Sequence, residues 1–368
     1  AAACACALAC IVAATNACVS PAVHSVEAPA AIGDGTTMVK VRDAWLRVLE
    51  LDPTLEAGAL PVVFVHGFGS RLESWRMVQP HIAMSHRTIS FDQRGFGYSE
   101  RSEAEYGPEA HAKDLVALLD AEHIERAILV GHSYGCGVVL RAALRHPERV
   151  AGVVLVSPFA LDEQVGSYFH WLRVPGLGEA MFAASYKDFP GEKYQLAFGP
   201  DARKKFVSVK ALDEVEKIEA QPGTMYAALA TVRGMDYAAV ENDYAKIDVP
   251  ITVVWGEKDR VTPIRMLDTL GFDHGVLVQV SVHGVDNSLL LDGLARYPQR
   301  LRGVVSIRPD TPDALLGRWH EAGVRGARLL GIVSGGIGLE AAEAIATRIA
   351  RFGWHLDLGL HGAAIETA

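Results

Sequence analysis

The amino-acid sequence predicts an α/β fold with a mostly parallel sheet, and two observations support that prediction. From residue 60, short apolar runs alternate with longer amphipathic stretches, as buried strands and covering helices do in a parallel sheet. A Gly-x-Ser-x-Gly segment at residues 131–135 lies between one such run and the helical stretch after it. The alternation breaks over about 161–248 and resumes after 266. We therefore expect an inserted helical lid and a second βα series.

The strands of the first series are expected where short apolar runs are rich in β-branched residues. These runs cover residues 61–65, 87–91, 127–130, 150–156 and 251–255. The amphipathic stretches 109–122 and 137–146 are expected to form helices. Residues 161–248 are rich in aromatic side chains and interrupted by prolines, a composition that suits either a lid or ordinary core helices.

The composition of the 368-residue chain suggests two domains and excludes several kinds of partner. The formal net charge is −9, whereas a nucleic-acid-binding face needs clustered Lys and Arg. The body of the chain has no run of 18 consecutive apolar residues, so we expect no membrane span. Four of the five cysteines lie in the first 18 residues and none has the paired spacing of a zinc site. We therefore predict no metal and no cofactor.

Residues 1–39 are predicted to be a low-complexity leader, since the first 14 are nearly all Ala, Cys and small aliphatic residues. An export signal has an apolar core and a small-residue cleavage site, which are present, and a positive n-region, which is absent. The sequence around Cys10 and Cys18 weakly resembles lipoprotein processing sites. We expect a cytoplasmic protein, and an exported or lipidated form stays open.

The segment Gly131-His132-Ser133-Tyr134-Gly135 has the pattern of a nucleophile elbow between a strand and a helix. Such a turn is so sharp that its serine takes a strained backbone conformation, and the flanking glycines relieve the crowding. The hydroxyl then projects from the edge of the sheet above the following helix. We therefore predict Ser133 as the nucleophile, supported by Gly131, His132 and Gly135.

The motif His-Gly-Phe-Gly at residues 66–69 directly follows the first expected strand. Acyl transfer needs backbone N–H donors where negative charge develops on the substrate oxygen. We expect one donor from Phe68 and the other from Tyr134, the residue after the nucleophile. Gly67 allows close approach of the backbone, and His66 belongs to the same supporting motif.

A third segment, Asp-x-Arg-Gly-x-Gly-x-Ser at 92–99, completes a pattern that resembles α/β-hydrolase fold enzymes over residues 40–263. The resemblance implies that Asp259, after the strand at 251–254, is the acid of a catalytic triad. It also implies that Asp92 and Arg94 hold loops by ion pairing. Serine at the elbow argues against epoxide hydrolases and haloalkane dehalogenases, which need a carboxylate nucleophile. It leaves esterases, lipases, amidases, C–C bond hydrolases and cofactor-free peroxidases open.

The triad histidine of this family follows the last strand in a context that this chain lacks. His283 comes after the apolar run 276–282 and is our candidate for the general base. If that run were the last parallel strand of the hydrolase sheet, His283 would lie at its carboxyl end, which is the catalytic edge.

The second series begins after residue 266 and comprises three βα units and a final strand. Its strands are expected at 276–282, 301–307, 324–330 and 354–360, and its helices at 287–297, 312–323 and 339–352. Such a series is what half of an eight-fold βα barrel would look like.

Residues 266–362 also resemble a lactonase-like amidohydrolase family with a TIM-barrel fold, on segments that include His274-Gly275 and His283-Gly284-Val285-Asp286-Asn287. In that reading His283 belongs to a barrel loop. The family's H-x-H motif is absent from the chain, so its metal site is not carried over. We predict a hydrolase domain at 40–265 joined to a barrel-like segment at 266–368, and the origin of the join stays open.

Three functions are consistent with these observations. The first is a serine hydrolase that acts on ester-like or other acyl small molecules through an acyl-enzyme. The second is a catalytically impaired fusion that binds small apolar ligands, and the third is an amidohydrolase-like lactonase. The C-terminal segment cannot close a barrel alone, so it would expose a strand edge that favours self-association.

Overall fold

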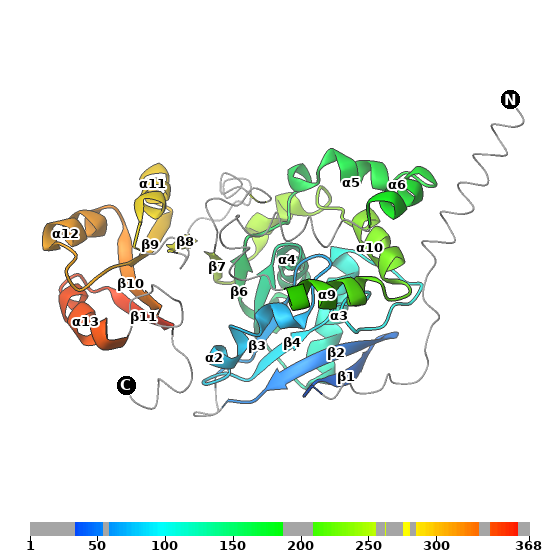
Figure 1. Cartoon of the computed structure of the whole chain (residues 1–368), viewed down its shortest axis with the longest axis horizontal. Coiled ribbons are helices and arrows are strands. Elements are labelled where there is room, and N and C mark those ends of the chain that lie inside the picture. The colour runs from blue at the N-terminus through cyan, green and yellow to red at the C-terminus, as the bar shows by residue number, and fades with distance from the viewer. Residues whose placement is uncertain are drawn as a thin grey trace, which may run out of the picture. The chain divides into compact units, whose positions relative to one another are not determined.

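The computed structural model describes residues 34–53, 59–186, 209–254, 262, 275–279, 285–330 and 339–359. The chain divides into two compact units, residues 1–250 with 260–262, and residues 251–259 with 263–368. The two units are described separately below (Figure 1).

A seven-stranded sheet has the strand order β1-β2-β4-β3-β5-β6-β7 (Figure 1). The pairs β1–β2 and β2–β4 are antiparallel, whereas the pairs β4–β3, β3–β5 and β5–β6 are parallel. Because β3, β5 and β6 are parallel, their carboxyl ends meet at one edge of the sheet. The strands are β1 (Thr37–Val41), β2 (Ala44–Leu51), β3 (Val62–Val65), β4 (Thr88–Phe91), β5 (Ala127–His132), β6 (Val150–Val156) and β7 (Ile251–Val254).

Two helices of the first unit pack against each other and bury most of their apolar residues. They are α3 (Pro108–Ala121) and α4 (Gly135–Arg145). α3 starts with Pro108, whose fixed φ suits a first helical position. α4 packs on β5 and β6, and its Val138, Val139 and Leu140 are fully buried. The shorter elements on the same unit are η1 (Leu72–Trp75), α2 (Gln79–Ile82) and η2 (Pro147–Arg149).

The predicted α/β fold with a mostly parallel sheet is confirmed, and the five expected strands lie within two residues of their observed bounds. The hairpin of β1 and β2 was not predicted. β1 begins at Thr37, inside the stretch 1–39 that the sequence assigned to a leader.

The described part of 161–248 is helical, as the sequence indicated. Its elements are η3 (Asp162–Gln164), α5 (Ser167–Leu172), α6 (Leu177–Ser185), α9 (Val209–Glu219), α10 (Thr224–Arg233) and η4 (Glu241–Lys246). The buried Arg101 donates from Nε to Oγ1 of Thr224 at 2.6 Å and from Nη1 to the carbonyl of Ser99 at 2.9 Å. The first residue of α10 is thereby tied to the loop that follows β4. A lid function for these helices stays a prediction.

The second unit contains a four-stranded parallel sheet with the order β11-β10-β9-β8. Strands and helices alternate along the chain, which confirms the predicted βα series. The elements are β8 (Gly275–Val278), α11 (Ser288–Arg296), β9 (Leu301–Ser306), α12 (Asp313–Glu321), β10 (Val324–Leu330), η7 (Leu339–Ala341), α13 (Ala342–Ala350) and β11 (His355–Gly359).

One hypothesis about β8 is wrong. We considered that this run might be the last strand of the hydrolase sheet, but β8 pairs with β9, with Gly275 opposite Leu301 and Val278 opposite Val304. The physical reason is local: consecutive strands joined by a short helix prefer to be neighbours in one sheet. Leu290 and Leu294 of α11 pack so closely on β9 that a Cβ at Gly303 would lie 2.7 Å and 2.9 Å from their methyl groups.

Candidate active site

Ser133 lies at the carboxyl end of β5, directly before α4, and its φ is +50°. This left-handed conformation is costly for any residue with a Cβ and is retained when surrounding contacts enforce it. Two hydrogen bonds do so: the N–H of Ser133 donates to the carbonyl of Val156 at 2.9 Å, and the N–H of Phe159 donates to the carbonyl of Ser133 at 3.1 Å. The strained turn is therefore fixed against the end of β6.

The two glycines of the elbow occupy positions where a side chain has no room. A Cβ at Gly131 would lie 2.7 Å from the carbonyl oxygen of Gly135 and 2.8 Å from the Cα of Cys136. A Cβ at Gly135 would lie 2.6 Å from the carbonyl oxygen of His66, at the end of β3. The predicted spacing of the motif is thus required by backbone packing on both sides of Ser133.

The loop after β3 lies directly against the elbow. A Cβ at Gly67 would be 3.3 Å from the Cβ of Ser133 and 3.1 Å from Nδ1 of His132. The next residue, Phe68, is half-buried, and its ring contacts the ring of Tyr134 edge to face at a centroid distance of 6.1 Å. The structure therefore brings together the predicted nucleophile and both predicted oxyanion residues.

His66 holds this loop in place. Its ring is fully buried, Nε2 accepts the N–H of Gln93 at 2.9 Å, and Nδ1 lies 2.8 Å from the carbonyl of Gly67. The amide of Gln93 returns a hydrogen bond from Nε2 to the carbonyl of His66 at 2.8 Å. Because Nε2 accepts and Nδ1 donates, the ring is neutral and both of its nitrogens are engaged within the protein. His66 thus supports the loop and is not a general base.

His132, the residue before Ser133, is half-buried. Its ring stands edge to face against the buried indole of Trp75 at a centroid distance of 6.4 Å. Trp75 packs in turn on Phe64 of β3 at 5.0 Å. The side chain of His132 therefore anchors the elbow to the hydrophobic core between β3 and β5.

Tyr134 is 1% exposed, and its hydroxyl lies 2.7 Å from Nδ1 of His111 in α3. Burial raises the pKa of this phenol well above its ordinary value, so the group is neutral. The backbone N–H of Tyr134 stands at the beginning of α4, where helix N–H groups point outward and favour negative charge.

His111 was not among the residues expected at the site. It is 1% exposed, and burial lowers its pKa to about 3. The ring is surrounded by Phe96, Tyr106 and Tyr134 at centroid distances of 6.1, 6.1 and 5.7 Å. The sequence gives no motif for it, since it lies inside α3 and meets Tyr134 only in the folded chain.

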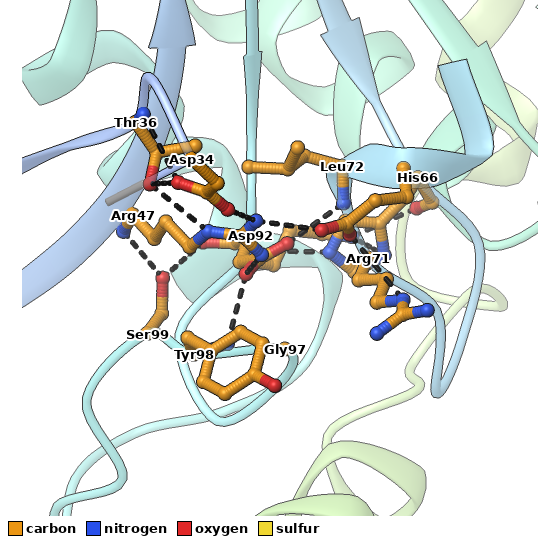
Figure 2. A network of polar contacts seen from close by, with 12 residues as sticks. Asp34, Thr36, Arg47, His66, Arg71, Leu72, Asp92, Gly97, Tyr98 and Ser99 are labelled. Carbon is orange, nitrogen blue, oxygen red and sulfur yellow. Dashed lines mark hydrogen bonds and ion pairs between the residues drawn. The ribbon is translucent and has the colours of Figure 1, made fainter. Parts of the chain in front are cut away.

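Asp92 is the centre of a buried polar network (Figure 2). Its carboxylate accepts the N–H groups of Leu72 at 2.7 Å and Tyr98 at 2.8 Å, and it pairs with Nη1 of Arg47 at 3.1 Å. Burial raises the pKa of Asp92 to about 6, and the guanidinium of Arg47 opposes that rise. Arg47 also contacts Glu73 at 2.6 Å. The network joins β2 and β4 to the segment that follows the oxyanion loop.

Arg94 forms a second buried pair. It donates from Nε to Asp114 at 2.8 Å and from Nη2 to Asp43 at 2.6 Å. Together with the contacts of Asp92, this confirms the expectation that Asp92 and Arg94 hold loops by ion pairing.

Two predicted triad members, Asp259 and His283, lie outside the described residues. Their roles stay predictions. Among the residues that the structure does describe, no group of three or more His, Cys, Asp or Glu side chains is arranged to hold a metal ion. Within the same residues, no helix has the length and apolar character needed to cross a bilayer.

Comparison with known families identifies the chain. Residues 61–290 match the family model described as alpha/beta hydrolase fold, and residues 247–368 match the model described as amidohydrolase. Because the first match covers more than half of the chain, the protein belongs to the α/β-hydrolase fold family. The second match agrees with the resemblance of the C-terminal segment.

Several hydrolases are similar to parts of the chain. The 2-hydroxymuconate semialdehyde hydrolase of Pseudomonas sp. (strain CF600) is 44% identical over 107 residues, which are 28% of this chain and 38% of that protein. Epoxide hydrolase A of Mycobacterium tuberculosis is 41% identical over 127 residues, 34% of this chain and 38% of that protein. The chain spans 38% to 64% of the lengths of the curated relatives that it matches.

Solved structures agree on the fold. A hydrolase from Pseudomonas aeruginosa PA01 superposes with a TM-score of 0.55 at 21% identity, over 72% of this chain and 97% of that one. A putative epoxide hydrolase from Pseudomonas aeruginosa superposes with a TM-score of 0.54 at 20% identity, over 74% and 99%. At these identities the likeness establishes the architecture alone.

Proposed function

We propose that the protein is a serine hydrolase that cleaves ester-like or other acyl substrates through an acyl-enzyme at Ser133. The observation that carries the proposal is the backbone of Ser133, held at a φ of +50° at the end of β5 with the Gly67 peptide packed beside it. A strained serine next to a glycine-rich loop is the arrangement that acyl transfer needs.

In the proposed reaction, Oγ of Ser133 attacks the substrate carbonyl carbon and its proton passes to a histidine base. His283 is the candidate for this base, although β8, the strand before it, pairs with β9 and not with the hydrolase sheet. The N–H groups of Phe68 and Tyr134 donate to the oxygen on which negative charge develops. The carbon–leaving group bond then breaks, and His283 returns the proton to the leaving group. A water molecule, deprotonated by His283, releases the acid and regenerates the serine, while Asp259 orients the histidine.

The serine at position 133 supports one of the activities that the names of the relatives suggest over the others. Epoxide hydrolase A and a haloalkane dehalogenase from Mesorhizobium japonicum are among them, and such enzymes need a carboxylate nucleophile. Serine at the elbow instead favours acyl chemistry. The relative named for 2-hydroxymuconate semialdehyde makes that compound the second substrate class to test.

Two alternatives stay in view. If His283 does not reach Ser133, the protein would bind small apolar ligands and turn over little. An amidohydrolase-like lactonase is favoured by the match of residues 247–368, but the absence of an H-x-H motif from the chain disfavours it.

The test measures hydrolysis of p-nitrophenyl acetate and butyrate and of 2-hydroxymuconate semialdehyde, with fluorophosphonate labelling in parallel. We expect Ser133→Ala to abolish labelling and turnover. His283→Ala and Asp259→Asn should lower kcat by several orders of magnitude and by about 10⁴-fold, respectively. His355→Ala, on the half-exposed His355 of β11, is the control and should leave turnover unchanged.

The possible outcomes distinguish the three candidate functions. Loss of turnover in both Ser133→Ala and His283→Ala supports the complete triad. If His283→Ala keeps full activity, another base serves and the proposed triad is wrong. A folded wild-type protein that labels weakly and turns over none of the substrates would support the impaired hydrolase, and metal-dependent lactone hydrolysis would support the third reading.

A further inference from the structure

The hydrogen bond between His111 and Tyr134 connects a buried helix to the residue that follows the nucleophile. His111 belongs to α3, and its Nδ1 lies 2.7 Å from the Tyr134 hydroxyl. Nε2 of His111 is buried, and the backbone of Arg94 lies near enough to the ring to favour a proton on it. A phenol is the stronger donor of the two groups, so we assign the hydroxyl as donor and Nδ1 as acceptor, with the proton of the neutral ring on Nε2.

The same ring cluster reaches the other half of the oxyanion site. Phe68 contacts Tyr134 at 6.1 Å and Phe96 at 5.6 Å, and Phe96 contacts His111 at 6.1 Å. These four side chains form a closed ring of neighbours, which we call the aromatic cluster: Phe68, Phe96, His111 and Tyr134. The side chains of both proposed oxyanion residues therefore belong to the cluster, so its packing contributes to the spacing of the two backbone segments that carry the N–H donors.

Within the aromatic cluster, the His111–Tyr134 contact is directional, whereas the ring contacts are not. Tyr134 is also the only one of the four that is covalently adjacent to Ser133. Its main-chain carbonyl accepts the N–H of Gly137 at 3.0 Å, in the first turn of α4. That carbonyl belongs to the peptide between Tyr134 and Gly135. The peptide between Ser133 and Tyr134 is held through the carbonyl of Ser133, which accepts the N–H groups of Cys136 at 2.9 Å and Phe159 at 3.1 Å. The hydrogen bond to His111 holds the side chain of Tyr134, so this residue is restrained at both its backbone and its ring.

We propose that His111 is a positioning residue of the hydrolase, which aims the backbone N–H of Tyr134 at the developing oxyanion by holding the Tyr134 hydroxyl. The inference rests on the proposed acyl chemistry at Ser133. His111 does not touch the substrate, so its effect passes through Tyr134. A misplaced oxyanion donor weakens transition-state binding and leaves ground-state binding nearly unchanged.

Four variants test the proposal. His111→Leu removes the acceptor, and Tyr134→Phe removes the hydroxyl. His111→Asn keeps an acceptor near the position of Nδ1. Tyr106→Phe is the matched control, because it removes a buried tyrosine hydroxyl, bound to the carbonyl of Ser102 at 2.7 Å, beside the same histidine but away from the elbow.

The activity readout is kcat for p-nitrophenyl butyrate per active site, with sites counted by fluorophosphonate titration so that unfolded protein does not contribute. We expect His111→Leu and Tyr134→Phe each to lower kcat by on the order of 10- to 100-fold with KM nearly unchanged. The double variant should lose no more than either single one, because both remove one interaction. His111→Asn should recover most of the loss, and Tyr106→Phe should keep wild-type kcat.

Additive losses in the double variant, or unchanged kcat in both single variants, would overturn the proposal. A wild-type protein without turnover would instead count against the proposed function, and a second measurement then decides. In ¹⁵N-labelled protein, the amide resonance of Tyr134 should shift in His111→Leu and Tyr134→Phe and return toward the wild-type position in His111→Asn. An amide resonance that stays in place in all variants would show that His111 does not position this peptide.

Discussion

Gly135 at the start of α4 and His66 at the end of β3 approach so closely that a Cβ on Gly135 would stand 2.6 Å from the His66 carbonyl oxygen. This contact joins the elbow to the oxyanion loop through main-chain atoms alone. Backbone packing therefore limits the separation of Ser133 from the loop, in addition to the ring contacts of the aromatic cluster.

Substituting Gly135 tests this contact. Gly135→Ala forces a methyl group against backbone atoms that cannot move independently, so we expect a loss of about 1–3 kcal/mol in the free energy of unfolding, measured in urea. Gly166→Ala is the matched control, since a Cβ there meets nothing within 4 Å and its φ is −60°. Equal stability changes in the two variants would show that the elbow has room for a side chain.

The strained backbone of Ser133 predicts an unusual order of stability among variants at this position. At its φ of +50°, glycine avoids a steric cost that alanine keeps, so Ser133→Gly should be more stable than Ser133→Ala by about 1 kcal/mol. Ser185, at the end of α6, is the control position, where alanine should be the more stable because glycine weakens a helix. Thermal unfolding of the four variants checks the ranking, which fails if alanine is favoured at both positions.

Much of the first sheet could be predicted, because β3, β4, β5 and β6 are short, mostly buried runs rich in apolar and β-branched residues. The hairpin escaped prediction for a tertiary reason. β2 carries Arg47 in its centre, and that side chain is buried with three acidic partners from other segments, Asp92, Glu73 and Asp34. From sequence alone, a charged residue in a strand is predicted to face solvent, because its ion-pair partner is not known.

At the candidate site, too, local features could be predicted from the sequence and tertiary contacts could not. Ser133 and its flanking glycines are recognisable because the elbow is a local backbone structure. His111 is not, because its importance comes from a contact with Tyr134 that no spacing within α3 encodes. The assignment of β8 failed because an apolar strand suits either sheet by composition, and only the pairing with β9 separates the two.

Removing the charge of Asp92 tests the network behind the oxyanion loop. In Asp92→Asn the amide NH₂ would replace one carboxylate oxygen and face the N–H of Leu72 or Tyr98, leaving a buried donor without an acceptor. We expect a loss of about 1–3 kcal/mol in stability, measured in urea. Asp243→Asn, which breaks a surface ion pair with Lys246, is the control and should cost less than about 1 kcal/mol. A larger loss of stability in Asp243→Asn than in Asp92→Asn would contradict the role of Asp92 as the centre of the buried network.

The buried His111 also predicts how stability depends on pH. Burial lowers its pKa to about 3, whereas an unfolded histidine has a pKa of 6.5. The rings of Tyr106, Tyr134 and Phe96 face the His111 ring, and positive charge on His66 and then on Arg94 further opposes its protonation.

Below pH 6.5 the unfolded chain therefore binds a proton that the folded chain refuses, so His111 contributes stability above that pH and loses it as the pH falls. The loss is about 1.4 kcal/mol per pH unit. Between pH 6.5 and 5 the stability advantage of the wild type over His111→Asn should shrink by about 2 kcal/mol. Tyr134→Phe lacks the same hydrogen bond but keeps the imidazole, so its stability should fall in parallel with the wild type. Urea unfolding at each pH measures these free energies of unfolding. If the difference in free energy between the wild type and His111→Asn does not change with pH, His111 titrates alike in the folded and unfolded states.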